Sequence, residues 1–66
     1  TSLPSYVIEV KHLKSDATDE AVQKALAEAK KQAERYAQGE AVKRISNLKR
    51  LALVYKGLRL SAFEIF

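Results

Sequence analysis

Several residue types that build common functional sites are scarce in this chain of 66 residues. Cysteine is absent, which excludes disulfides, a thiolate zinc site and a cysteine nucleophile. The single histidine, His12, excludes a multi-histidine metal site, and no acid is evident that would orient it toward a serine. The two glycines, Gly39 and Gly57, are too few for a glycine-rich phosphate-binding loop. A metal held by carboxylates remains open.

Long apolar runs are also absent. None approaches the ~20 residues of a membrane-spanning helix, and no signal-peptide pattern is visible at the start. We therefore expect a cytoplasmic protein, which the lack of cysteine also fits. Hydrophobic residues make up 47% and charged residues 30% of the chain, a composition typical of a globular protein.

The length bounds how much the chain can bury. A domain of about 60 residues buries only about 60% of the surface that its unfolded chain exposes, so a metal, a partner subunit or the rest of a larger protein would help to stabilise it. Since the chain starts at Thr1 rather than at methionine, we expect residues 1–66 to be one small domain that is a fragment of a larger one.

The patterns of apolar residues predict four main elements. Residues 5–11 alternate as a strand, with Tyr6, Ile8 and Val10 on an apolar face that we expect to meet a helix. Residues 19–38 have an alanine-rich apolar stripe with helical spacing. Asp16 or Thr18 is the expected N-cap of this helix.

The second half of the chain predicts two more strands. Residues 40–48 suggest a short helical turn after Gly39, which we expect to stop the long helix. The near-continuous apolar run of residues 49–56 is typical of a strand that is buried on both faces. Gly57 favours a tight turn, and the alternation in residues 58–65 shifts phase, as it does at a β-bulge.

The predicted fold is therefore α/β. Strand, helix, strand and strand follow in that order, and a strand–helix–strand crossover makes the first two strands parallel. The last strand returns as an antiparallel hairpin, which gives a mixed three-stranded sheet with one long helix packed on it.

Two pairs of polar residues are candidates for a site. Glu9 and Lys11, two residues apart on the first strand, point to the same side. A carboxylate there can hold Mg²⁺, and an ammonium can stabilise charge on a phosphate; alternatively the two form a solvated ion pair. Gln32 and Tyr36 are neighbours on the long helix, although Tyr36 can also cap the core and Gln32 can be a plain surface residue.

In this order and on these elements, the motifs Glu9-x-Lys11 and Gln32-x-x-x-Tyr36 resemble those of the PD-(D/E)XK nuclease superfamily. The similarity is greatest to a branch at the C-terminal end of bacterial proteins with an AAA-type ATPase-like domain, and it covers roughly residues 5–60. It implies part of a restriction-endonuclease-like core, with a mixed sheet and helices on its faces. It also implies Mg²⁺-dependent hydrolysis of phosphodiester bonds in nucleic acid.

The resemblance also implies roles for single residues. Glu9 would bind the metal, with the main-chain carbonyl of Val10 as a further ligand. Lys11 would be the catalytic lysine, and Gln32 and Tyr36 would position the site or the nucleic acid. A second metal-binding Asp is implied on an earlier strand, but no Asp precedes Glu9, so we expect the 66 residues alone to be inactive unless another chain supplies a carboxylate.

The formal net charge of +4 leaves further functions open. Basic residues concentrate in the second half, and Lys43, Arg44, Lys49 and Arg50 are candidates for contact with nucleic acid. A solvated edge that opposes aggregation is the alternative. Two other functions compete with a nuclease: a plain basic nucleic-acid-binding module, and a non-catalytic module that forms a homo-oligomer through an exposed strand edge.

Overall fold

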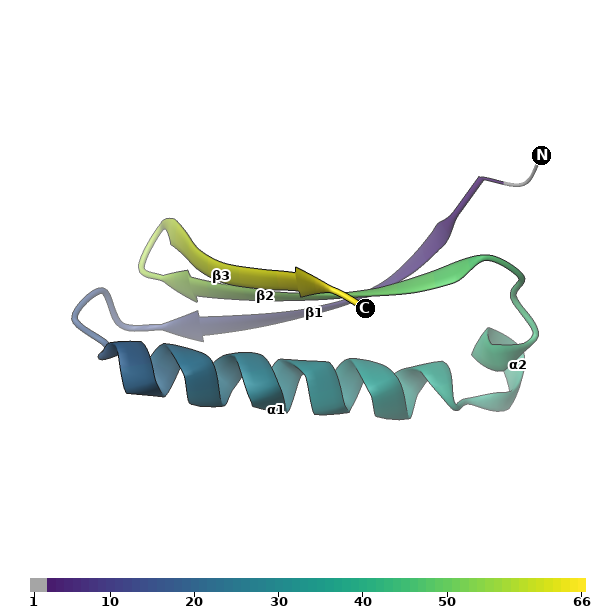
Figure 1. The fold of residues 1–66 in the computed structure, drawn as a ribbon, viewed down its shortest axis with the longest axis horizontal. Helices are drawn as coiled ribbons and strands as arrows, with labels where there is room; N and C mark the ends of the chain where they lie inside the picture. Colours follow the sequence, from purple (N-terminus) through teal and green to yellow (C-terminus); the bar gives the residue numbers. More distant parts are fainter. Residues whose placement is uncertain (1–2) are drawn as a thin grey trace.

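The computed structural model describes residues 3–66, and residues 1–2 lie outside it. Its elements follow the predicted order: β1 (Ser5–Leu13), α1 (Asp19–Ala37), α2 (Glu40–Lys43), β2 (Leu48–Lys56) and β3 (Arg59–Ile65). The strands form one sheet in the order β1-β2-β3, with β1 parallel and β3 antiparallel to β2. Helix α1 lies along one face of this sheet (Figure 1). The predicted α/β fold class is confirmed.

Helix α1 begins at a side-chain cap and ends beside Gly39. The Thr18 hydroxyl oxygen accepts a hydrogen bond from the main-chain N–H of Ala21 at 3.1 Å, so Thr18 rather than Asp16 is the N-cap. Gly39 has an extended backbone and is the N-cap of α2. It separates the two helices without the left-handed conformation that usually makes glycine a helix stop.

The β2–β3 hairpin contains both irregularities that the sequence predicts. Gly57 has a φ of 59° in the turn, where a residue without Cβ is favoured. The register changes between Val54 and Tyr55, which pair with Ala62 and Leu60 and leave Ser61 as the extra residue. This bulge explains why the alternation of apolar residues changes phase along β3.

The face of β1 that meets α1 is the opposite of the one predicted. Val7 is buried under the helix, whereas Tyr6, Ile8 and Val10 are exposed on the other side. Within residues 3–66, the buried residues between α1 and the sheet are all small: Val7, Val22, Ala25, Ala29, Ala33, Ala52 and Val54. Because small side chains on both sides let a helix approach a sheet closely, the Ala52 and Val54 face of β2 packs on the alanine stripe. Parallel pairing of β1 with β2 then turns Val7, Glu9 and Lys11 toward the helix.

The predicted burial of β2 on both faces is wrong for this chain. Leu51, Leu53 and Tyr55 remain partly exposed on the side away from α1. Among the described residues, the helices cover one face of the sheet and leave the other open (Figure 1). The resemblance implied helices on both faces, so this expectation is also not met within residues 3–66.

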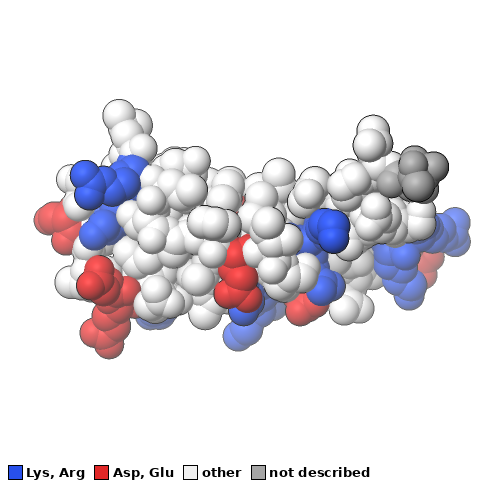
Figure 2. Space-filling view, turned by 45° about the horizontal axis from the view of Figure 1, so that its top comes forward, with Lys and Arg blue, Asp and Glu red and all other residues white. Residues whose placement is uncertain are grey.

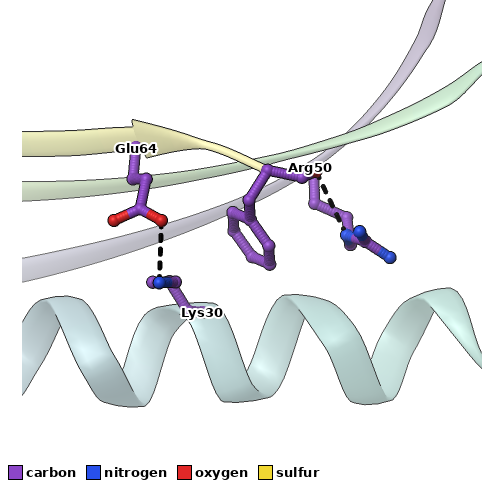
Figure 3. Close-up of polar contacts among 4 residues, drawn as sticks. Lys30, Arg50 and Glu64 are labelled. Atoms are coloured by element: carbon purple, nitrogen blue, oxygen red, sulfur yellow. Dashed lines mark hydrogen bonds and ion pairs between the residues drawn. The ribbon is translucent and has the colours of Figure 1, made fainter.

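Two ion pairs connect α1 to the sheet. Lys30 Nζ lies 2.7 Å from Glu64 Oε2 of β3 (Figure 3), and Arg50 Nη1 of β2 lies 3.0 Å from Glu34 Oε1. The four side chains are 35–51% exposed, so each pair stabilises the fold by less than ~1 kcal/mol. No helix in the described part of the chain combines the length and the apolar character needed to cross a bilayer.

Candidate functional site

The polypeptide path brings the strand motif and the helix motif to the same end of the molecule. After β1 the chain turns and α1 runs back along the sheet, so the last turn of α1 lies beside the first half of β1 (Figure 1). Here Glu9 and Tyr36 line one pocket of about 310 Å³, together with Tyr6, Val7 and Ile8. One member of each predicted pair therefore meets at a shared cavity.

Tyr36 is not a core residue. Its side chain is 65% exposed, although its position continues the apolar stripe of α1. The alternative role of Tyr36 as a cap on the core is therefore wrong. A phenol that lines a pocket and remains open to solvent can contact a ligand there.

Glu9 and Lys11 share the face of β1 that turns toward α1, and both are half-buried. Within residues 3–66, neither forms an ion pair or a hydrogen bond with a side chain. The alternative in which the two form an ion pair with each other is thus not realised. A half-buried carboxylate beside a half-buried ammonium, both without a charged partner, is an arrangement that a metal ion or a phosphate can satisfy.

The structure brings Gln32 and Lys11 less close to this pocket. Gln32 is exposed, one helical turn before Tyr36, and neither Gln32 nor Lys11 lines the pocket. The side chain of Val10 points to the opposite face of the sheet, which leaves its main-chain carbonyl as the predicted ligand.

The metal-binding capacity of the described residues is limited to isolated carboxylates. No group of three or more His, Asp or Glu side chains lies close enough together in residues 3–66 to hold a metal ion. Glu9 therefore fits a metal only as one ligand of a larger set. Mg²⁺ is often bound by one or two carboxylates with several waters, so the donor set is incomplete rather than chemically unsuitable.

The four basic residues predicted to contact nucleic acid fall into two groups. Lys43, Arg44 and Lys49 are exposed around α2 and the start of β2. Arg50 is engaged within the chain, because its Nε donates a hydrogen bond to the carbonyl oxygen of Phe66 at 3.2 Å (Figure 3) and its guanidinium also pairs with Glu34. The guanidinium carbon also lies 5.1 Å from the centre of the Phe66 ring. Arg50 thus holds the last residue against the sheet.

Three residues of the pocket were not predicted as site residues: Tyr6, Val7 and Ile8. Tyr6 is the one of them with a polar group. The alternation of β1 placed Tyr6 on the apolar face, and the structure confirms this face but leaves it uncovered. Tyr6 lines the pocket together with Ile8 of the same face. A tyrosine at the exposed start of a strand was the available signal, since its hydroxyl favours a boundary between apolar surface and water.

No family model, curated protein or solved structure matches this chain.

Proposed function

We propose that this chain is the part of a PD-(D/E)XK-type nuclease domain that carries the Glu-x-Lys strand and the Gln/Tyr helix. In the complete protein this domain hydrolyses phosphodiester bonds of nucleic acid with Mg²⁺. The observation that carries the proposal is the shared pocket of Glu9 and Tyr36, which come from different elements. The lack of a side-chain partner for Glu9 within residues 3–66 supports a ligand role for this carboxylate.

Each residue then has a chemical task. Glu9, with the main-chain carbonyl of Val10, supplies oxygen ligands of the kind that Mg²⁺ prefers. A bound Mg²⁺ polarises a phosphoryl oxygen and makes water a better nucleophile. The Lys11 ammonium stabilises negative charge that develops on the phosphate, while Gln32 and Tyr36 orient the nucleic acid near the metal.

A second carboxylate has to come from outside this set of residues. β1 lies at one edge of the sheet, so the side of the strand away from β2 is open to another strand. A strand paired there can place an acid beside Glu9. Until it does, we expect the 66 residues to bind Mg²⁺ weakly and not to cleave nucleic acid.

The exposed basic residues near α2 fit the same function. Lys43, Arg44 and Lys49 can contact phosphates of nucleic acid in a manner that depends on salt. Arg50 is less suited to contact phosphates, because its guanidinium already pairs with Glu34 and donates a hydrogen bond to Phe66. The cytoplasm, where proteins rarely depend on disulfides, is the proposed location.

Manganese tests the metal site, since its unpaired electrons broaden the NMR signals of nearby amides. In the ¹⁵N-labelled chain we expect broadening to be strongest at residues 9–10 and around Tyr36. Glu9→Gln should abolish this pattern. Glu28→Gln removes an equally charged but exposed side chain of α1 and should leave the pattern unchanged. Broadening centred on Asp16 and Asp19, or broadening that survives Glu9→Gln, would contradict the proposal.

The catalytic role is tested in any longer protein that carries this segment. Lys11→Met should reduce the cleavage of supercoiled plasmid by roughly 100-fold or more, as the loss of one charge-stabilising donor does in other enzymes. Lys31→Met changes an exposed lysine of α1 and serves as the matched control. Equal activity of the two variants would refute a catalytic lysine at position 11.

A self-associating module without catalysis is the second candidate, and the unpaired edge of β1 favours it. If two copies paired antiparallel about Val10, Glu9 of each copy would lie opposite Lys11 of the other, and such opposite charges stabilise neighbouring strands. Glu9→Lys would then dissociate the pair, whereas Glu28→Lys would not.

A further inference from the structure

Most of the larger apolar side chains of the three strands lie on the side of the sheet that α1 does not cover. We call this side the open face and define it by its nine residues: Tyr6, Ile8, Val10, Leu51, Leu53, Tyr55, Leu60, Phe63 and Ile65. The pairing registers place them on one side of all three strands. By contrast, the buried residues under α1 in the described part of the chain are alanine and valine. The chain therefore has more apolar bulk outside its core than inside it.

The open face is also poor in charge. On β2, the register places the charged residue Lys49 on this side, opposite Tyr6 and near the start of the strand. At the other end, the rings of His12 and Tyr55 stack with their centres 5.3 Å apart. Figure 2, an oblique view from this side, shows a largely white surface in its upper half, whereas charged groups are concentrated in its lower half and at both ends. Two copies can meet here without placing like charges opposite each other in the centre.

The exposed area is large enough for a specific interface. Six of the nine residues are 41–61% exposed, and we take the apolar surface that they expose to be on the order of 600 Å² per copy. This is the upper end of the apolar patches that monomers expose. Two such faces together would bury about 1,200 Å², which reaches the lower limit of stable protein–protein interfaces at ~1,200 Å².

We infer that two copies of this chain dock through their open faces. The dimer is a four-layered sandwich of helix, sheet, sheet and helix, in which the sheets lie about 10 Å apart with their strands inclined by ~30°. An isologous interface of this kind needs a self-complementary surface, which a flat apolar face without central charges provides. Glu9 and Lys11 lie on the other side of the sheet, so docking does not bury these two charged groups, although it involves Tyr6 and Ile8 of the pocket that Glu9 lines.

Sedimentation equilibrium over a wide range of protein concentrations tests this inference. The unchanged chain should approach twice the monomer mass, and its unfolding midpoint should rise with concentration, because association stabilises the folded state. Phe63→Glu places a carboxylate of each copy in the interface and should weaken dimerisation by about 100-fold or more. Leu58→Glu makes the same change at a fully exposed turn residue outside the open face and should leave dimerisation intact.

The unchanged chain also gives a test that does not depend on variants. In a mixture of ¹³C-labelled and unlabelled copies, intermolecular NOEs should connect the methyl groups of Ile8 and Ile65 with the ring of Phe63. A monomer at all concentrations would overturn the inference. Intermolecular NOEs confined to the main chain of β1 would also overturn it, because they indicate pairing through the strand edge. Neither result bears on manganese binding at Glu9, so the two proposals fail separately.

Discussion

Replacement of Val54 by alanine tests whether the thin core under α1 holds the fold together. Val54 is fully buried and packs in a cluster with Val22 and Ala25, and partly buried neighbours surround it: Leu13, Leu26 and Ala62. The substitution deletes two buried methyl-sized groups, each worth ~0.8 kcal/mol of transfer free energy. The small space left behind adds about 1 kcal/mol at ~24 cal/mol per Å³. We therefore expect the free energy of unfolding to fall by about 2.5 kcal/mol.

That loss is large for this chain, since a domain of this size rarely has more than ~3–5 kcal/mol of stability from one core. Urea denaturation followed by circular dichroism measures it, and the slope with urea should not change. Val10→Ala deletes the same groups from the open face, where Val10 is 41% exposed. At concentrations where single copies prevail, it should cost less than ~1 kcal/mol. A Val54→Ala cost below that of Val10→Ala would refute the location of the core.

Substitutions at three further positions test local features by urea denaturation. Gly57→Ala should cost about 1 kcal/mol or more, because Gly57 has φ of 59° and an added Cβ would lie 3.2 Å from Ser15 Cβ; an unchanged midpoint would contradict the turn geometry. Thr18→Ala should cost ~1 kcal/mol through loss of the N-cap, whereas Thr18→Ser should retain most of the stability. Arg50→Ala should cost ~1 kcal/mol and shift the NMR signals of Phe66, and unshifted signals would show that Arg50 does not hold the last residue.

The element order was predictable because each segment has a clear local signal. The alanine stripe between Thr18 and Gly39 has helical spacing, and Gly57 with the phase shift after it predicts a hairpin with a bulge. These signals act within a few residues, and the structure confirms the helix, the turn and the bulge. Even so, β1 extends two residues beyond the predicted end, to Leu13, since pairing with β2 continues to Lys56.

The orientation of β1 was not predictable from its own pattern. A face with Tyr6, Ile8 and Val10 is the more apolar one, and hydrophobicity alone would bury it. The deciding factor lies on β2, where Ala52 and Val54 allow α1 to approach closely and larger side chains on the other face would not. β2 is apolar on both faces, so its hydrophobic pattern does not indicate the choice; only the smaller size of Ala52 and Val54 compared with Leu51, Leu53 and Tyr55 does.

The candidate site was predictable in part. Placing Glu9 and Tyr36 at one pocket required only that α1 runs antiparallel to β1, which follows from a strand–helix–strand crossover. The engagement of Arg50 with Glu34 and Phe66 could not be foreseen, because it depends on the register between β2 and the end of the chain.

The bulge at Ser61 limits how this sheet can grow. It disturbs the pairing of β3 with β2, and such an irregularity makes an edge strand a poor template for the pairing of another strand. β1, at the opposite side of the sheet, pairs with β2 in unbroken register from Ser5 to Leu13 and offers a regular ladder. Only the β1 edge of the sheet is regular. A strand could therefore be added at β1 but not at β3, so copies of the sheet would not join edge to edge into a fibre.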